Sequence, residues 1–339
     1  MHLLRRFALF LARTPLVGLI LAALVGLSLA GCTDQSSSAQ RDVIGTLRIG
    51  VIGSVNVLTG PLGFAHSRGE LLNALKPLGV DAVEVYSFPN GPDLNQALLG
   101  GRLDVGNYGD TPALVAKGSG LDTRLLAITQ FNNDAGVVVK DPSIKSLKDL
   151  AGKKIGVPKG SYIDRYLQGA LQQEGITAQL VHLYPADQEG PLSTGEIAGA
   201  ALPGVIPSVA LQSFQRKGYR LVDSVYTNHP GLAGTSVSVA ANPFLAKQPD
   251  FGAAWQKLIA DSVIYAKAHW DEYLAFEIKN SKANPADIRA AANPGGYAPE
   301  PFPAAGVRLL EGTKAFLVAQ GSLKTDYSLN EWLYKPSHA

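Results

Sequence analysis

The chain has 339 residues, of which 46% are hydrophobic and 17% charged, a globular composition with enough length for two domains. The formal net charge is +2, but Arg5, Arg6 and Arg13 lie in a leader without acidic residues, so the remainder holds 27 basic and 28 acidic side chains. This near balance argues against nucleic acid as a partner.

The first 31 residues have the pattern of a bacterial export signal. Basic residues precede an apolar stretch over 15–30, and Leu29-Ala30-Gly31 then leads to Cys32, the only cysteine of the chain. This arrangement resembles the lipobox of bacterial lipoproteins, which implies removal of residues 1–31 and lipidation of Cys32. A transmembrane anchor is the alternative, although the apolar run is short for a span of ~20 residues. The expected location is periplasmic or at another extracytoplasmic face, with a lipid anchor in a bacterial membrane.

Residues 32–42, rich in Ser and Gln, are predicted to form a flexible tether. With the sole cysteine at its start, the folded part has neither disulfides nor thiol chemistry.

Strand and helix patterns alternate in the folded part. Strands are predicted at 47–52, 83–86 and 154–157, extended runs at 124–127 and 136–140, a helix at about 62–78, a short helix at 93–98 and a one-turn helix at 146–152. Alternation of this kind is typical of an α/β fold with parallel sheets and right-handed crossovers, and two such sheets fit the length.

The stretch 104–114 predicts a buried strand that turns at Gly109 into a helix. Thr111 is the expected N-cap and Pro112 the first helical residue. The free amides and the positive end of the helix dipole, with Asp110 and the Thr111 hydroxyl beside them, suit an oxyanion such as a sulfonate, carboxylate or nitrate. An ordinary capped helix is the alternative interpretation.

Two further helix starts repeat this arrangement. Ser161 is the expected N-cap of a helix with Asp164 at its third position, Gly160 allows close approach of a ligand, and Lys159 adds a cation. The loop 54–61 supplies Ser54 and other polar groups before a third helix. Because ligands gather beyond the carboxyl ends of strands in α/β sheets, we expect these starts to converge on one cleft. The expected ligand-binding set is Ser54, Asn56, Gly109, Asp110, Thr111, Lys159, Gly160, Ser161 and His229.

Four motifs in order, residues 61–69, 109–112, 150–157 and 159–161, resemble the aliphatic sulfonate, taurine and nitrate-binding proteins of ABC importers. The resemblance covers nearly the whole mature chain. It implies a type II periplasmic-binding-protein fold, in which two α/β lobes joined by two extended crossovers close on a ligand. It also implies an ABC permease and its ATPase as partners, a small organic anion as ligand, and no resident cofactor.

That fold places the first crossover near 135–139 and the second near 235–239. Lobe one would then comprise 43–136 and 236–334, and lobe two 137–235. In the helix expected at 251–269, the stripe of Trp255, Leu258, Ile259 and Val263 has helical spacing and is interpreted as core, not as ligand surface.

The segment 197–208 departs from the family pattern. It holds neither a carboxylate nor a tryptophan, where the family has an acidic and aromatic segment. A cationic amine on the ligand would lack its counter-charge there, which disfavours taurine, whereas an apolar wall suits an alkyl or aryl tail. Nitrate and a heteroaromatic, thiamin-precursor-like compound remain alternatives.

An enzyme on the same fold is the remaining alternative. A hydrolase needs a nucleophile with a base, yet Gly160-Ser161 lacks the flanking glycine of a nucleophile elbow and no histidine motif stands out. His229 is the one histidine expected to face the cleft, and no His or Cys spacing indicates a metal. The sequence therefore predicts a monomeric solute-binding lipoprotein, not an enzyme.

Overall fold

The computed structural model describes residues 43–336, which belong to one compact unit. The predicted signal peptide, the lipidated Cys32 and the tether up to residue 42 lie outside the described residues. Within the described part, no helix is long and apolar enough to cross a membrane.

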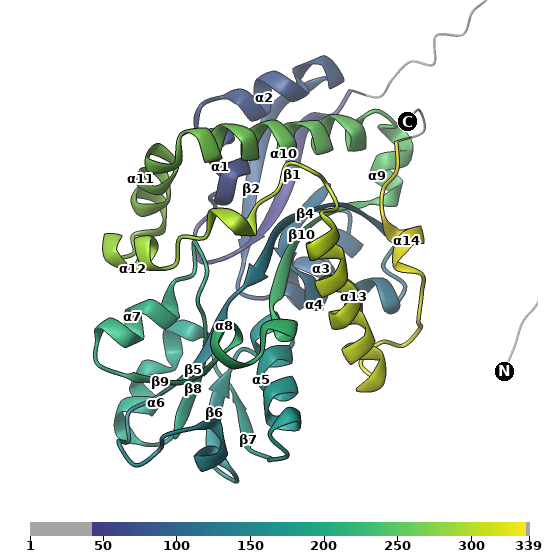
Figure 1. Ribbon diagram of the computed structural model, residues 1–339. Coiled ribbons are helices and arrows are strands. Elements are labelled where there is room, and N and C mark those ends of the chain that lie inside the picture. The colour runs from purple at the N-terminus through teal and green to yellow at the C-terminus, as the bar shows by residue number, and fades with distance from the viewer. Residues whose placement is uncertain (1–42, 337–339) are drawn as a thin grey trace, which may run out of the picture. The chain divides into compact units, whose positions relative to one another are not determined.

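The first sheet has five strands in the order β2-β1-β3-β10-β4 (Figure 1). Four strands run in the same direction, and β10 lies antiparallel between β3 and β4. The strands are β1 (Gly45–Ile52), β2 (Val80–Phe88), β3 (Val105–Gly109), β4 (Thr123–Asn133) and β10 (Gly234–Ala241).

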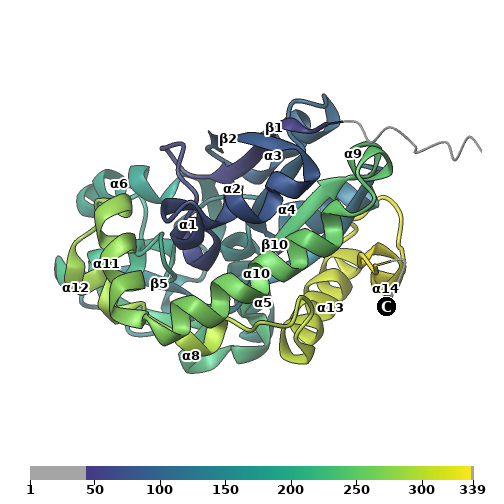
Figure 2. The same cartoon turned by 90° about the horizontal axis from the view of Figure 1, so that it is seen from above.

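Helices cover both faces of this sheet, and an apolar core lies between the helices and the sheet on each face. On one face Leu71 and Trp255 pack over the strand residue Ile49, and on the other Leu94 and Leu310 pack over Val239. The first face is covered by α1 (Gly60–Ser67), α2 (Glu70–Leu75) and α10 (Phe251–Ala268), and the second by α3 (Gly91–Leu99), α4 (Asp110–Gly118), α13 (Ala304–Ala319) and α14 (Leu329–Trp332). The view from above shows α10 running across the sheet (Figure 2).

The second sheet has the order β7-β6-β8-β5-β9, with β5 antiparallel to its neighbours β8 and β9. One face packs on Tyr166 and Leu167 of α5, and the other on Leu192 of α6 and Phe214 of α7. The elements are β5 (Ala135–Val139), η2 (Leu147–Leu150), β6 (Lys154–Val157), α5 (Tyr162–Gln173), β7 (Gln179–His182), η3 (Pro185–Asp187), α6 (Glu189–Thr194), β8 (Gly199–Pro203), α7 (Ala210–Arg216), β9 (Arg220–Ser224), α8 (Val225–Asn228) and η4 (Pro230–Leu232).

Two extended passages join the sheets. The chain leaves β4 at Asn133 and enters β5 at Ala135, and it returns from η4 into β10 at Gly234. The α/β class and the two crossovers match the sequence prediction, but wholly parallel sheets do not, because each sheet receives one strand that runs in the opposite direction. The proposed lobe boundaries stay a prediction.

The helix predicted over 62–78 is wrong as a single element. It breaks at Arg68 and Gly69, because Gly69 adopts a left-handed φ of 76°, and α2 begins after it. After α10 the chain forms a hairpin that packs Tyr273 and Ile288 against Ile206 of the other lobe. The remaining elements are η1 (Lys76–Leu78), α9 (Asn242–Lys247), α11 (Trp270–Ser281), α12 (Pro285–Ala290) and η5 (Pro294–Gly296).

Candidate functional site

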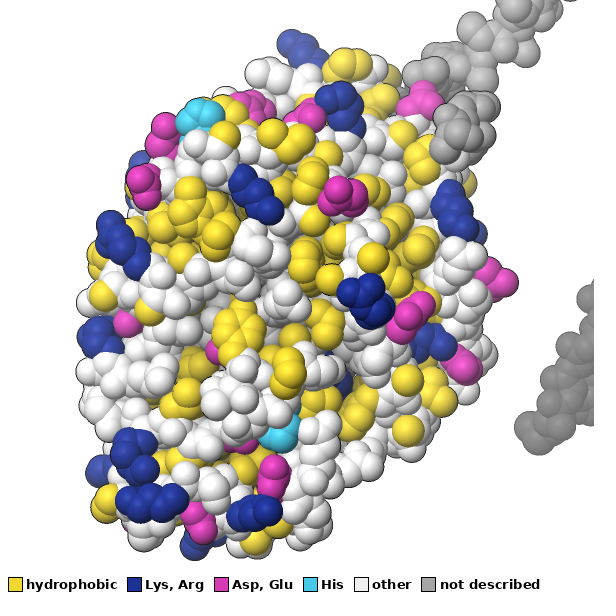
Figure 3. Space-filling model, viewed as in Figure 1, with side chains coloured by type: hydrophobic (Ala, Val, Ile, Leu, Met, Phe, Trp, Pro, Cys, Tyr) yellow, Lys and Arg dark blue, Asp and Glu magenta, His cyan; other side chains and the backbone are white. Residues whose placement is uncertain are grey.

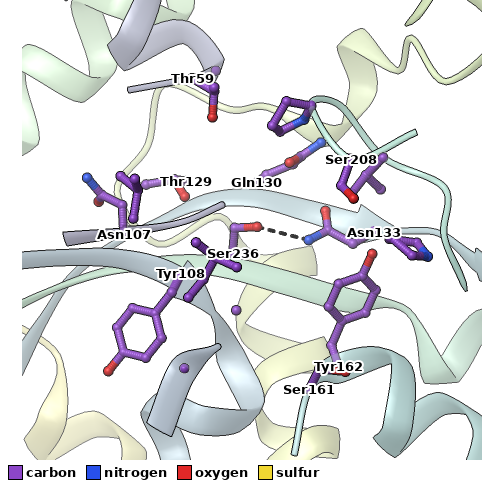
Figure 4. A pocket seen from close by; sticks show the side chains of 18 of the residues that line it. Thr59, Asn107, Tyr108, Thr129, Gln130, Asn133, Ser161, Tyr162, Ser208 and Ser236 are labelled. Atoms are coloured by element: carbon purple, nitrogen blue, oxygen red, sulfur yellow. Dashed lines mark hydrogen bonds between the residues drawn. The ribbon is translucent and has the colours of Figure 1, made fainter. Parts of the chain in front are cut away.

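A cavity of about 290 Å³ lies between the two sheets. The first sheet and its helices contribute polar groups such as Thr59, Asn107 and Ser236, and the second contributes Ser161 and Tyr162 (Figure 4). This is the ligand pocket considered below.

The starts of α1, α3, α4 and α5 all reach the pocket. Three of them pack tightly together. A Cβ atom on Gly91 would lie 2.3 Å from the Pro112 ring, so α3 and α4 meet through a glycine, and Gly109 lies against the Tyr162 ring of α5. The predicted convergence of helix starts is therefore present, although the side chains at each start differ from the prediction.

The start of α5 is the most open of these to a ligand. Ser161 is its N-cap, as predicted, and its Oγ accepts from the Asp164 amide at 3.3 Å while donating to the Pro158 carbonyl at 2.6 Å. The Gly160 amide donates to the Asp164 carboxylate at 2.8 Å. Within residues 43–336, no group accepts a hydrogen bond from the amides of Tyr162 and Ile163. Two unbonded amides at the positive end of a 12-residue helix are thus available at the pocket.

The start of α4 is already neutralised by its own carboxylate. The N-cap is Gly109, so the prediction of Thr111 as N-cap is wrong. Asp110 is fully buried, and its Oδ2 accepts from the amide and hydroxyl of Thr235 and the hydroxyl of Thr313. Both the amide and the hydroxyl of Thr111 donate to Asp110 Oδ1, at 2.5 and 2.9 Å. Neither Asp110 nor Thr111 lines the pocket, because these bonds tie α4 to β10 and α13.

The start of α1 also meets a buried carboxyl group. The Gly60 amide donates to Glu277 Oε1 at 2.6 Å, and Glu277 is fully buried on α11. Burial raises the pKa of Glu277 to about 7, against the opposing effect of the Gly60 amide. The carboxyl groups at α1 and α4 take amides of the first helical turn, whereas at α5 Asp164 takes only the Gly160 amide and leaves those of Tyr162 and Ile163 unbonded. Within the described residues α5 is therefore the better anion site.

The outer part of the loop before α1, with Ser54 and Asn56, does not line the pocket. Asn56 is exposed, and its Oδ1 accepts from the amide and the hydroxyl of Ser87, both at 2.8 Å. Ser54 is exposed in the same loop. The pocket takes Thr59 and Gly60 from this segment instead.

His229 does not face the pocket, so that prediction is wrong. Its ring is 5% exposed and lies between α5 and β9, with Nδ1 2.7 Å from Gln173 Oε1 and Nε2 3.2 Å from Asp223 Oδ2. The short helix α8 turns the chain inward, which explains why a loop histidine is buried.

The apolar wall expected from residues 197–208 is present, since Pro203, Val205, Ile206 and Pro207 line the pocket. The prediction that the apolar stripe of α10 belongs to the core and not to the ligand surface is only partly correct. Its residues are buried as expected, but Ile259 and Val263 also line the pocket from the opposite side. One part of the cavity is thus enclosed by apolar side chains from both lobes.

Sequence reasoning missed most of the polar side chains of the pocket. Their shared feature is a position near the carboxyl end of a first-sheet strand or on the neighbouring β10, and this could have been the signal for them. They are Asn107, Thr129, Gln130, Asn133 and Ser236. Figure 4 shows Asn133 next to Ser236 and near Tyr162, with Thr59 across the pocket.

The pocket carries little formal charge. Among the described residues that line it, Lys159 alone is charged, and it is exposed. Burial raises the pKa of Tyr108, Tyr162 and Tyr297, so these phenols stay protonated at neutral pH. The lining therefore offers neutral donors and one cation, an arrangement suited to an anion.

In residues 43–336 no cluster of three His, Cys, Asp or Glu side chains is placed to hold a metal ion. On the face seen in Figure 3, basic and acidic side chains are scattered over the surface, as expected from the near-neutral composition.

Comparison with known proteins identifies a family for this chain. The family model described as NMT1/THI5 like matches residues 78–273. A protein of Bacillus subtilis named as a putative aliphatic sulfonates-binding protein is 27% identical over 260 residues, which cover 75% of each chain.

Solved structures share the fold. The alkanesulfonate-binding protein SsuA from Xanthomonas axonopodis, bound to MOPS, superposes with a TM-score of 0.70 and 18% identity over 86% of this chain and 99% of that one. The desulfurization enzyme DszB gives a TM-score of 0.65 and 17% identity over 85% of this chain and 96% of that chain. The fold is therefore that of periplasmic binding proteins, and it is found in both a binding protein and an enzyme.

Proposed function

The chain belongs to the NMT1/THI5-like family, and from this premise we propose that it is the solute-binding component of an ABC importer. It captures a small organic anion, in the first instance an aliphatic sulfonate, and delivers it to the permease and its ATPase. The sulfonate-binding name of the B. subtilis relative supports this assignment.

The observation that carries the proposal is the start of α5. Its Tyr162 and Ile163 amides have no acceptor within residues 43–336, Lys159 lies beside them, and no carboxylate lines the pocket. A sulfonate oxygen supplies the missing acceptors, and the helix dipole favours its charge. In this proposal Gly109, Lys159, Gly160 and Ser161 remain at the anion site, whereas Ser54, Asn56, Asp110, Thr111 and His229 act outside it.

The apolar wall supports a ligand with a carbon tail. Nitrate has no tail to contact Val205, Ile206 or Val263, and a taurine amine would lose hydration without gaining a counter-charge. An alkanesulfonate without an amine fits both parts of the pocket.

Binding without turnover is part of the proposal. The described lining contains no histidine, aspartate or glutamate, the side chains that most often act as general bases, and no cysteine that could act as a nucleophile. The protein acts as a monomer, held at the extracytoplasmic face of a bacterial membrane by lipid on Cys32, and its lobes, 43–136 with 236–334 and 137–235, close around the ligand.

A thermal-shift panel tests the function. Alkanesulfonates, taurine, nitrate, carboxylates and pyrimidines are compared, and a ligand at 100 times its Kd stabilises the fold by about 2.7 kcal/mol. We expect alkanesulfonates to give the largest rise in Tm. Stabilisation by pyrimidines or nitrate alone, or consumption of a bound sulfonate, would overturn the proposal.

A further inference from the structure

The floor of the pocket contains buried polar atoms without partners. Both amide atoms of Asn107, Nδ2 and Oδ1, are buried and have no hydrogen-bond partner within residues 43–336. The same holds for Oδ1 of Asn133, a residue only 1% exposed. Leaving such groups unbonded lowers stability, so unpartnered polar atoms on residues that line a ligand cavity indicate contacts that a ligand completes.

These side chains come from three adjacent strands. Ser236 of β10 pairs with Gly109 of β3, and Ser238 pairs with Asn107, so Asn107 and Ser236 are diagonal neighbours on one face. Such neighbours lie about 7–8 Å apart. Asn133 of β4 joins them, since its Nδ2 donates to Ser236 Oγ at 3.0 Å (Figure 4). All three line the pocket.

The chemistry of this group differs from that at α5. The backbone N–H groups at the start of α5 only donate hydrogen bonds. Asn107 presents a donor and an acceptor side by side, and the Ser236 hydroxyl can serve as either. An ionised sulfonate only accepts hydrogen bonds, so it would leave Asn107 Oδ1 unsatisfied. A hydroxyl or carboxamide donates as well as accepts and can satisfy both Asn107 atoms.

We propose that Asn107, Asn133 and Ser236 form a second subsite that selects ligands carrying an uncharged hydrogen-bonding group, a hydroxyl or carboxamide, in addition to the anion. The inference rests on the proposed function, with the sulfonate at the start of α5. Asn107 is the specificity-determining residue, because both of its polar atoms await a partner.

The test is calorimetric titration of the purified protein with two matched series. One is the unsubstituted alkanesulfonates of two to six carbons, and the other is the same chains with a terminal hydroxyl. At one or more chain lengths the hydroxylated compound should bind at least tenfold more tightly. In Asn107→Leu this preference should fall below twofold, while the unsubstituted alkanesulfonate binds as tightly as before or more tightly.

Two further variants provide a control outside the pocket and a second change within it. Asn56→Leu makes the same change at an exposed amide outside the pocket and should leave the preference intact. Ser236→Ala removes one hydroxyl and should reduce the preference, which covers the case in which Asn107→Leu fails to fold. Equal affinity for both series in the parent protein, or a preference that survives both pocket variants, would overturn the subsite and leave the sulfonate function standing. Failure of every sulfonate to bind would instead overturn the proposed function.

Discussion

The carboxyl group of Glu277 accepts a hydrogen bond from the Gly60 amide at 2.6 Å, so a fully buried acid on α11 closes the start of α1 at the pocket wall. Its other oxygen has no hydrogen-bond partner within residues 43–336. This contact joins residues 217 positions apart and leaves α1 a poorer anion site than α5.

Glu277 should make the fold less stable as pH rises. Burial raises its pKa from 4.5 to about 7, so between these values the unfolded chain has lost the proton that the folded chain still holds. The stabilising contribution is therefore complete below pH 4.5 and is lost as pH rises through about 7, an effect of up to about 3 kcal/mol. Asp134, with its pKa raised by burial to about 6, acts in the same direction.

Urea unfolding of the parent and of Glu277→Gln at pH 5, 6.5 and 8 measures this effect. The variant keeps an acceptor for Gly60 and should show a flatter decline of the free energy of unfolding with pH. Glu272→Gln, an exposed change on the same helix, is the control. An unchanged slope in Glu277→Gln would contradict the assignment.

The Tyr162 amide should contribute to anion affinity independently of its side chain. Tyr162 is the first residue of α5, where proline is well accepted, and Ser161 has the extended backbone, φ −98° and ψ 172°, that precedes proline easily. Tyr162→Ala keeps the amide N–H and Tyr162→Pro removes it, while both lose the phenol. We expect the proline variant to bind an alkanesulfonate about tenfold more weakly than the alanine variant, the range of one hydrogen bond to a charged group. Equal calorimetric affinities at similar Tm would exclude this amide as a ligand donor.

His229 should affect stability and not binding. Its ring is held by Gln173 and Asp223 outside the pocket, so His229→Gln is expected to lower the free energy of unfolding by about 1–3 kcal/mol. Sulfonate affinity at pH 7 should change less than twofold. A tenfold loss of affinity without a change in Tm would return His229 to the binding site.

The proposed lipid anchor depends on Cys32. Cys32→Ser should move the protein from the membrane fraction to the soluble fraction of cells, because the proposal attaches the lipid at this side chain, while the affinity for the ligand should stay the same. Immunoblotting of separated fractions measures the distribution. Equal retention of the variant in membranes would exclude the lipoprotein assignment.

Local sequence patterns predicted the alternating elements and the cap at Ser161, because both depend on neighbours within a few residues. They could not predict the role of Asp110, which is fixed by Thr235 and Thr313, 125 and 203 positions away. Asn107 and Ser236 are neighbours only because β10, which comes late in the chain, pairs with β3. The polar floor of the pocket is thus a product of tertiary structure, which explains why motif spacing identified the helix starts and missed the floor.

The proposed pocket recognises an organic anion through its charge. Calorimetric titration of the purified protein with an alkanesulfonate and with the alkanesulfonamide of the same chain length tests it most directly, since the two have similar shape and only the sulfonate is ionised at pH 7. We expect at least one sulfonate of two to six carbons to bind at least 100-fold more tightly than its sulfonamide. Equal affinity for the pair, or binding of the sulfonamide alone, would contradict it.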